Sequence, residues 1–569
     1  MPGANVLLPA RNFGDIGAPP PDLAHLQAHY ARLSSDLDGA ANSAQALAVF
    51  SAWDGLRREF TTWASLTELH FQQDTNDPRY RAANDLLNEL RPKVTGLDVA
   101  IKQKFLAGAL RPELERTLGA YLFERWALDV TAFDPAIESH AVREAQIADE
   151  YTALLAGAAF DFQGERANLS TISKWREDRD REVRRQAEIT KWSFFTEHAS
   201  ELDERYGELV RVRHEMARTL GLRDFTDLGY RRMLRTGYGT AEVARYREDI
   251  VREIVPLAQR IVQRQVSDLG VDCLMYWDEP VFDLRRPPQP PQRYAQLIAS
   301  ASDAFAGVDG EVGAFARLMI ESDLLDLQAR DGKAGGGFCT SFPAYGLPYI
   351  FANFNGTTGD VNVLLHEMGH AFQGYASRTM PVMEYLWPTY EACEVHSMSM
   401  EFFAWPQLEK FFGDDAQRYR EQHLKSSLLF LPYGAAVDHF QHFVYERPDA
   451  SARERNAYWK QLEATYLPWR QYGGIEHLER GGLWQAQRHI YQMPFYYIDY
   501  TLALCCALQF WSHSLDDYGA ALSAYTALCR RGGELPFQEL VRSAGLRSPF
   551  DAGVLRGVAE RAAQVLDLP

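Results

Sequence analysis

The sequence predicts a mainly helical protein with one small antiparallel β element. Apolar residues recur three and four positions apart through most of the 569 residues, as in AQALAVFSAWDGLRREF, and charged residues occupy the opposite face. Two short stretches rich in aromatic and β-branched residues, FCTSF and PYIFANF, interrupt this pattern in 331–360. Pro343 and Gly346 separate them, which favours a hairpin.

Composition excludes several classes of function. The formal net charge of −18 disfavours binding to nucleic acid, whose phosphates are also negative. No apolar run reaches the roughly 18 residues of a membrane helix, and the start, MPGANVLLPARNFGDIG, lacks the pattern of a secretory leader. The six cysteines show no metal-binding spacing, so we interpret them as free thiols. We therefore expect a cytoplasmic protein that binds neither nucleic acid nor membranes.

The stretch HEMGHAFQGY, from His366 to Tyr375, carries the chemistry. Residues four apart on a helix differ by about 40° in direction, so His366 and His370 point the same way and can share one Zn²⁺. Glu367 lies beside them, where a carboxylate can accept a proton from water. Gly369, inside the helix, predicts close packing. The alternative is an ordinary buried helix whose histidines form hydrogen bonds.

A zinc hydrolase needs a third protein ligand and one open position. Ala376 stands where metzincins have a third histidine, so that class is excluded. The segment PTYEACEVHSMSMEFFAW offers three carboxylates on one helical face, Glu391, Glu394 and Glu401. A carboxylate facing a core of Met, Phe and Trp is costly unless it is paired or metal-bound. Spacing alone does not choose among the three.

Together, HEMGHAFQGYASR and EACEVHSMSMEFF resemble the oligoendopeptidase F branch of the thimet oligopeptidase family of zinc metallopeptidases. The segments ELDERYGELVRVRHEMARTLG, DHFQHFVYE and GGLWQAQRHIYQMPFYYIDY extend the resemblance over about 175–565. The resemblance implies one Zn²⁺ per chain, held by His366, His370 and Glu394, with Glu367 as general base. It leaves Glu391, Glu401 and His396 near the site without an assigned role.

The same resemblance implies the architecture. We expect a prolate, helical, zincin-type peptidase with a deep central channel and the β element next to the HExxH helix. Region 1–175 would form part of one channel wall. Region 176–569 would be the catalytic region, with a proline-rich connection at about 277–294.

The segment RHIYQMPFYYIDY supplies candidate donors for the oxyanion that amide hydrolysis generates. Pro494 suits the first turn of a helix, on which Tyr497 and Tyr500 share a face. The resemblance assigns His489, Tyr497 and Tyr500 to holding the substrate carbonyl. The choice between Tyr496 and Tyr497 stays open, because the spacing from the histidine varies between branches.

We therefore expect a zinc-dependent metalloendopeptidase that hydrolyses internal bonds of short, unstructured peptides, with PYIFANFNG as an edge to which substrate adds as a strand. One alternative is a zinc carboxypeptidase or dipeptidyl carboxypeptidase of related fold, although no basic residue stands out to bind a terminal carboxylate. Another is a non-catalytic peptide-binding protein. His439 and His442 are interpreted as structural, because no third ligand lies near them.

Overall fold

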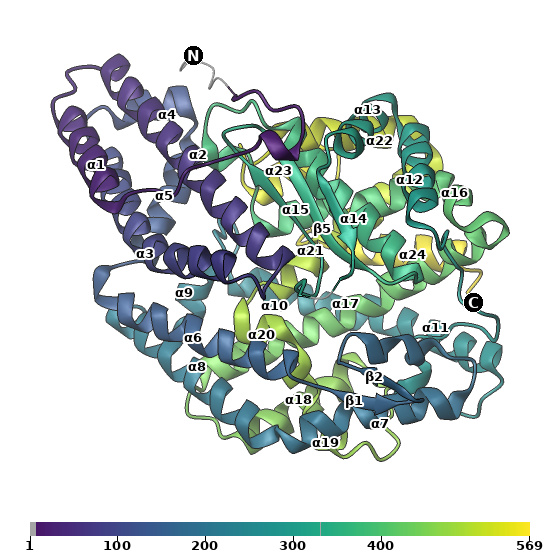
Figure 1. Cartoon of the computed structure of the whole chain (residues 1–569). Coiled ribbons are helices and arrows are strands. Elements are labelled where there is room, and N and C mark those ends of the chain that lie inside the picture. Colours follow the sequence, from purple (N-terminus) through teal and green to yellow (C-terminus); the bar gives the residue numbers. More distant parts are fainter. Residues whose placement is uncertain (1–6, 331, 569) are drawn as a thin grey trace.

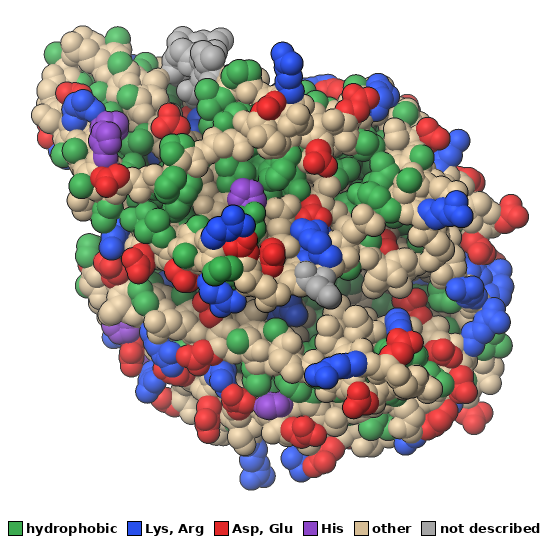
Figure 2. Space-filling view, in the orientation of Figure 1, with side chains coloured by type: hydrophobic (Ala, Val, Ile, Leu, Met, Phe, Trp, Pro, Cys, Tyr) green, Lys and Arg blue, Asp and Glu red, His purple; other side chains and the backbone are tan. Residues whose placement is uncertain are grey.

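The computed structural model describes residues 7–330 and 332–568, so the first six residues of the N-terminal stretch and position 331 of the hairpin segment lie outside it. The protein is mainly helical, which confirms the expected fold class, and a small sheet lies next to helix α14 (Figure 1). No helix in the described ranges is both long and apolar enough to cross a membrane. Acidic and basic side chains are interspersed on the face shown in Figure 2.

Five N-terminal helices, purple to blue in Figure 1, pack around an apolar cluster of their own. They are α1 (Leu23–Asp38), α2 (Ser43–Gln73), α3 (Pro78–Ala107), α4 (Arg111–Leu118) and α5 (Ala120–Ala132). Trp53 of α2 stacks on Phe105 of α3 and meets Trp126 of α5 edge-on, with ring centroids 5.9 and 5.4 Å apart. Val382 and Tyr385, far along the chain, complete this cluster.

The middle of the chain forms eight further helices. They are α6 (Glu138–Ala156), α7 (Arg181–Glu197), α8 (Ala199–Thr219), α9 (Phe225–Arg232), α10 (Thr240–Asp249), α11 (Val255–Leu269), α12 (Tyr294–Val308) and α13 (Gly310–Glu321). The proline-rich stretch 279–293 between α11 and α12 contains no helix or strand. A short antiparallel pair, β1 (Phe160–Phe162) and β2 (Glu165–Ala167), lies between α6 and α7.

The sheet beside α14 has three strands in the order β3-β5-β4. Most of PYIFANFNG lies in the middle strand, β5, which is paired on both sides, so the prediction that this segment forms a free edge for substrate is wrong. The predicted hairpin is present as β4 (Phe338–Phe342) and β5 (Leu347–Phe354), which pair antiparallel. The third strand, β3 (Leu325–Gln328), pairs parallel to β5 and was missed, because four residues carry too little periodicity to identify. Lys333 joins the strands: its fully buried ammonium donates to the carbonyls of Gln328 and Ala352.

The C-terminal part contains the helices that build the site. They are α14 (Thr358–Ala376), α15 (Tyr390–Phe403), α16 (Glu409–Phe412), α17 (Ala416–Glu446), α18 (Ala452–Tyr466), α19 (Glu476–Glu479), α20 (Arg488–Gln492), α21 (Tyr497–Asp516), α22 (Tyr518–Arg531), α23 (Phe537–Ser543) and α24 (Val554–Val565). Helix α15 packs against both α14 and α21. Cys505 and Cys506 of α21 are fully buried free thiols, as expected from their apolar surroundings.

The loop 377–389, which joins α14 to α15, is held by the N-terminal helices. The indole of Trp126 and the guanidinium of Arg57 both donate to Glu384 Oε1, each at 2.6 Å, and Arg125 donates to the Glu384 carbonyl at 2.6 Å. Burial alone would raise the pKa of Glu384, but Arg57 holds it well below its usual range. A buried ionic contact therefore fixes the connection between the two helices of the site.

Candidate metal centre

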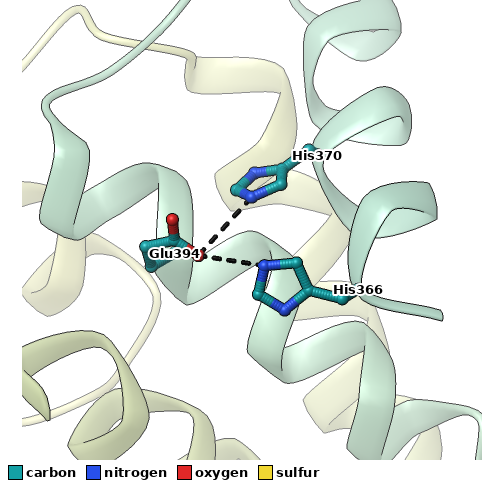
Figure 3. Close-up of side chains that lie close together, drawn as sticks. All are labelled: His366, His370 and Glu394. Atoms are coloured by element: carbon teal, nitrogen blue, oxygen red, sulfur yellow. Dashed lines mark ion pairs between the residues drawn. The ribbon is translucent and has the colours of Figure 1, made fainter. Parts of the chain in front are cut away.

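Three predicted site residues converge on one point, as Figure 3 shows. His366 and His370 leave the same side of α14 and face Glu394 on α15. Glu394 Oε2 lies 3.2 Å from His366 Nε2 and 3.4 Å from His370 Nε2. One ligand atom from each residue lies within 4.8 Å of the other two, and no other such group of three occurs in the described ranges.

Gly369 allows the two helices to approach closely enough for this arrangement. A Cβ atom at position 369 would lie 2.6 Å from the carbonyl oxygen of His396 and 2.7 Å from the Cα atom of Ser397, both on α15. Any other residue would therefore push α15 away from α14. The close packing that the sequence predicted for this glycine is present.

Glu401 and His423 orient the first histidine. His366 Nδ1 lies 2.7 Å from Glu401 Oε1, and His423 Nε2 lies 2.6 Å from Glu401 Oε2. Trp405 Nε1 donates to His423 Nδ1 at 3.2 Å; since an indole only donates, His423 carries its proton on Nε2. His366 Nδ1–H likewise donates to the carboxylate, so in the neutral form of His366 the Nε2 lone pair faces Glu394.

The electrostatics favour a positive charge at His366. Burial opposes the charged form, but hydrogen bonds to Glu394 and Glu401 raise the pKa of His366 well above its ordinary value. His370 and His366 in turn hold the pKa of Glu394 well below its ordinary value, although burial alone would raise it. Buried carboxylates around two imidazoles provide the surroundings of a bound cation, whether a proton or a metal ion.

Glu394 is itself oriented by two hydroxyl groups. Tyr496 donates to Oε1 at 2.5 Å, and Ser397 donates to Oε2 at 2.8 Å. The carboxylate is therefore fixed with Oε2 toward the histidines.

Glu367 lies on α14 between the two histidines and is 7% exposed. Its Oε2 atom is buried and has no hydrogen-bond partner among the described residues. Burial raises the pKa of Glu367, although both neighbouring histidines favour its charged form. A buried carboxylate oxygen with free acceptor capacity can bind and deprotonate a small polar molecule.

The second predicted group comes from α20 and α21. Gln487 Nε2 donates to His489 Nδ1 at 2.8 Å, so the neutral His489 carries its proton on Nε2, which lies 3.4 Å from the Tyr500 hydroxyl. Burial lowers the pKa of His489 to about 4 and keeps it neutral. Tyr496 packs on Tyr500, with ring centroids 4.8 Å apart. His489 and Tyr500 both pack on Tyr496, which donates to Glu394, so the two donors lie next to the metal centre.

Tyr497 and Tyr496 differ in their surroundings. The Tyr497 ring packs against Phe430 and Tyr433 and also against His489 and Tyr500, but in the described residues its hydroxyl has no hydrogen bond to the rest of the site. Tyr496, left open by the sequence, instead contacts Glu394. The helix also begins at Tyr497 rather than near Pro494, because intervening Phe495 has a positive φ of 68°.

The remaining candidates have structural surroundings. Glu391 accepts from the hydroxyl of Tyr238 at 2.9 Å. His396 is 1% exposed, and its Nδ1 lies 3.4 Å from the thiol of Cys529. The two histidines of DHFQHF make hydrogen bonds to tyrosine hydroxyls: His439 with Tyr458 and Tyr466, and His442 with Tyr230.

The donor set fits a zinc ion. Ligand atoms about 2.0–2.1 Å from a tetrahedral zinc ion are about 3.3–3.4 Å apart. The observed separations from Glu394 Oε2 to the two Nε2 atoms, 3.2 and 3.4 Å, match this edge length. Two imidazoles and one carboxylate, with a carboxylate behind one imidazole, are typical of zinc hydrolase sites.

Family models match two parts of the chain: Peptidase family M3 over residues 311–560, and the Peptidase M3 N-terminal domain over residues 13–133. The chain belongs to peptidase family M3. The family supports a metallopeptidase, and the matched core region contains both helices of the metal centre. Among curated proteins, none matches the chain.

Solved structures of this fold agree with the family. A structure described as Pz peptidase A with inhibitor 2 is 41% identical, covers 98% of this chain and 99% of its own, and has a TM-score of 0.95. A putative oligoendopeptidase F is 44% identical with the same coverage and TM-score. A putative oligoendopeptidase F from Bacillus anthracis str. Ames is 38% identical, with 98% coverage of each chain and a TM-score of 0.90. The resemblance to the oligoendopeptidase F branch is thereby confirmed.

Proposed function

We propose that this M3 peptidase is a zinc-dependent endopeptidase that hydrolyses internal peptide bonds of short oligopeptides. The convergence of His366 Nε2 and His370 Nε2 on Glu394 Oε2, each at the separation expected between two ligands of a tetrahedral zinc ion, carries the proposal. A zinc ion held by these atoms supplies Lewis acidity, which polarises the substrate carbonyl and acidifies water.

Glu367 acts as the proton carrier. Its buried, unpartnered Oε2 accepts the proton of the attacking water and returns it to the leaving amine nitrogen. The raised pKa that follows from burial suits a group that must both accept and donate near neutral pH.

His489 and Tyr500 donate to the substrate carbonyl oxygen as negative charge develops on it. Gln487 fixes the imidazole tautomer so that Nε2–H faces the Tyr500 hydroxyl and the site. We assign the supporting role of a second tyrosine to Tyr496, which orients Glu394, rather than to Tyr497.

The substrate binds in extended form along β4. This strand pairs on one side with β5, and no described strand pairs with its other side. A peptide can add there through backbone hydrogen bonds, which tolerate varied sequences. Short peptides without fixed structure suit this mode best.

Cleavage of peptides blocked at both ends, together with zinc analysis, tests the proposal. Wild-type protein should contain one zinc per chain and cut these peptides, and Glu367→Gln should lower kcat by roughly 10²–10⁴-fold with zinc retained. Glu421→Gln, on the exposed side of α17, is the matched control and should cut normally. Full cleavage by Glu367→Gln, or activity independent of zinc, would reject the mechanism. Cleavage only of peptides with a free carboxyl end would instead indicate a carboxypeptidase.

A further inference from the structure

The short segment before α21 has an unusual backbone. Phe495 has a φ of 68°, in the left-handed region that a residue with a bulky side chain rarely adopts. The next residue, Tyr496, holds Glu394, and Tyr500 follows one turn later beside His489. We propose that Gly229, Arg235 and Gln441 are positioning residues that clamp Phe495 in this conformation and thereby aim Tyr496 and Tyr500 at the site. The inference rests on the proposed function.

Both polar backbone groups of Phe495 are held by buried side chains. The Phe495 N–H donates to Gln441 Oε1 of α17 at 2.8 Å, and its carbonyl accepts from Arg235 Nη2 at 2.5 Å. Gln441 is fully buried and Arg235 is 6% exposed. Water cannot replace these partners, so the left-handed conformation satisfies groups that another conformation would leave unpaired.

Gly229 provides the space for the ring. The Phe495 side chain is fully buried against Tyr230 and His442, with ring centroids 5.6 and 5.1 Å apart. It lies directly over Gly229 of α9, where a Cβ atom would be 2.5 Å from Phe495 Cδ2 and 3.0 Å from Cε2. Both the backbone and the ring of Phe495 are therefore held in one arrangement.

Arg235 also connects the clamp to helix α21, which carries Tyr500. Its Nη2 donates to Asp499 Oδ1 at 2.8 Å, and both side chains are fully buried. Asp499 lies in the first turn of α21, and its N–H donates to the Tyr496 carbonyl at 2.9 Å. One guanidinium thus fixes the residue before Tyr496 and the residue before Tyr500.

The consequence for the reaction is geometric. A change of φ at Phe495 rotates the chain that follows, so the Tyr496 and Tyr500 hydroxyls would leave Glu394 and His489. Misplacement of a donor by about 1 Å can cost about 10²-fold in rate. The clamp should therefore affect kcat through the tyrosines, with little effect on KM.

Steady-state kinetics of Gln441→Met and Gly229→Ala test this inference, each made in wild-type protein and in the double variant Tyr496→Phe/Tyr500→Phe. Gln441→Met removes the acceptor at nearly constant length, and Gly229→Ala displaces the ring. Each should lower kcat at least about tenfold with KM within about threefold, and should add less than about twofold once both hydroxyls are absent in Tyr496→Phe/Tyr500→Phe. Zinc content should stay at one per chain.

Two controls separate positioning from general destabilisation. Gln509→Met removes a similar buried bond on α21, where Gln509 Oε1 accepts from the Arg547 N–H at 3.0 Å. Gly313→Ala crowds a remote contact, since a Cβ atom there would lie 2.6 Å from the Ala306 Cα atom. Both controls should lower thermal stability and leave kcat within about twofold.

The outcomes are distinct. If wild-type protein cuts peptides with zinc, but the clamp variants keep the wild-type kcat, the clamp inference is wrong and the proposed function stands. The same conclusion follows if their losses multiply fully with that of Tyr496→Phe/Tyr500→Phe. If wild-type protein shows no zinc-dependent cleavage, the proposed function fails and the inference fails with it. Should Gly229→Ala not fold, Gln441→Met decides the question alone, because it introduces no steric conflict.

Discussion

The two halves of the candidate site are built in different ways. The metal-binding group stands on two regular helices, α14 and α15, which touch through Gly369. The donor group stands on α20 and α21, and the irregular turn that joins them is held by side chains from α17 and from the loop after α9. The first half is specified by spacing along the chain and the second by contacts between distant segments. We expect the second half to be the more sensitive to changes outside the site.

Tyr500→Phe has the largest expected effect on the donor half. Loss of an oxyanion donor lowers kcat by roughly 10²-fold, and KM should change little, because the hydroxyl acts mainly as charge develops. Steady-state kinetics with a blocked peptide measure both constants. Tyr497→Phe, three residues earlier on the same helix, is the control and should retain most activity. Equal losses in the two variants would contradict the assignment of Tyr496 and Tyr500 as the pair that faces the site.

Glu401→Gln tests the metal half. Its carboxylate holds the His366 tautomer, and loss of such a partner lowers metal affinity by about 10–100-fold. Competition with a chelator measures the zinc dissociation constant. Glu391→Gln, on the same helical face but bonded to Tyr238, should bind zinc as tightly as wild type. A normal zinc affinity in Glu401→Gln would show that α14 and α15 alone fix the histidines.

Gly369→Ala tests the contact between the two metal-bearing helices. The added methyl group would overlap the α15 backbone, so we expect a loss of about 1–3 kcal/mol in the free energy of unfolding. Urea denaturation measures it. Gly55→Ala is the matched control, because a Cβ atom at this position in α2 would meet nothing within 4 Å. That variant should be as stable as wild type or slightly more so. Equal stability of the two variants would refute the close contact.

Acidification should have the smallest effect of the four changes. It should lower the free energy of unfolding through His442, which packs on Phe495 beside the donor group. Burial lowers the pKa of His442, beside Phe495, to about 4; Asp438 opposes this shift, and Arg247, Arg235 and His439 reinforce it. In the unfolded chain the His442 imidazole is protonated below about pH 6.5, whereas in the folded chain it stays neutral down to about pH 4. The free energy of unfolding therefore falls as pH decreases between these values.

Unfolding in urea at pH 7 and pH 6 checks this expectation. The loss attributable to His442 should be about 0.7 kcal/mol over that interval, and it should disappear in His442→Gln. An equal pH dependence in the variant would mean that other buried groups account for the acid sensitivity.

The sequence predicted the half of the site that depends on local spacing. The helical period placed His366, Glu367 and His370 together, and the structure brings the two histidines to Glu394. Spacing left three carboxylates open, because Glu391, Glu394 and Glu401 share one face of α15. Only the partners on other segments separate them: the two histidines, Tyr238 and His423.

Residues that act across long sequence separations were not predictable. His423 and Gln487 carry no motif, and their proximity to the site follows from how α17 and α20 pack. The choice between Tyr496 and Tyr497 depended on the positive φ of Phe495, which no propensity scale indicates for phenylalanine. Strand β3 was missed for a related reason, since its pairing partner rather than its own four residues defines it.

The anchoring of Glu384 by Arg57 and Trp126 has a consequence for how the enzyme is assembled. A fragment starting after residue 133 would still contain every histidine and carboxylate of the site, yet the loop joining their two helices would have lost its counter-charge. On the ribosome, the first 130 residues emerge before the loop they hold. The HExxH motif alone would thus not suffice for an active peptidase. The metal centre on α14 and α15 would form only after the loop between them has bound to the N-terminal helices, which are synthesised first.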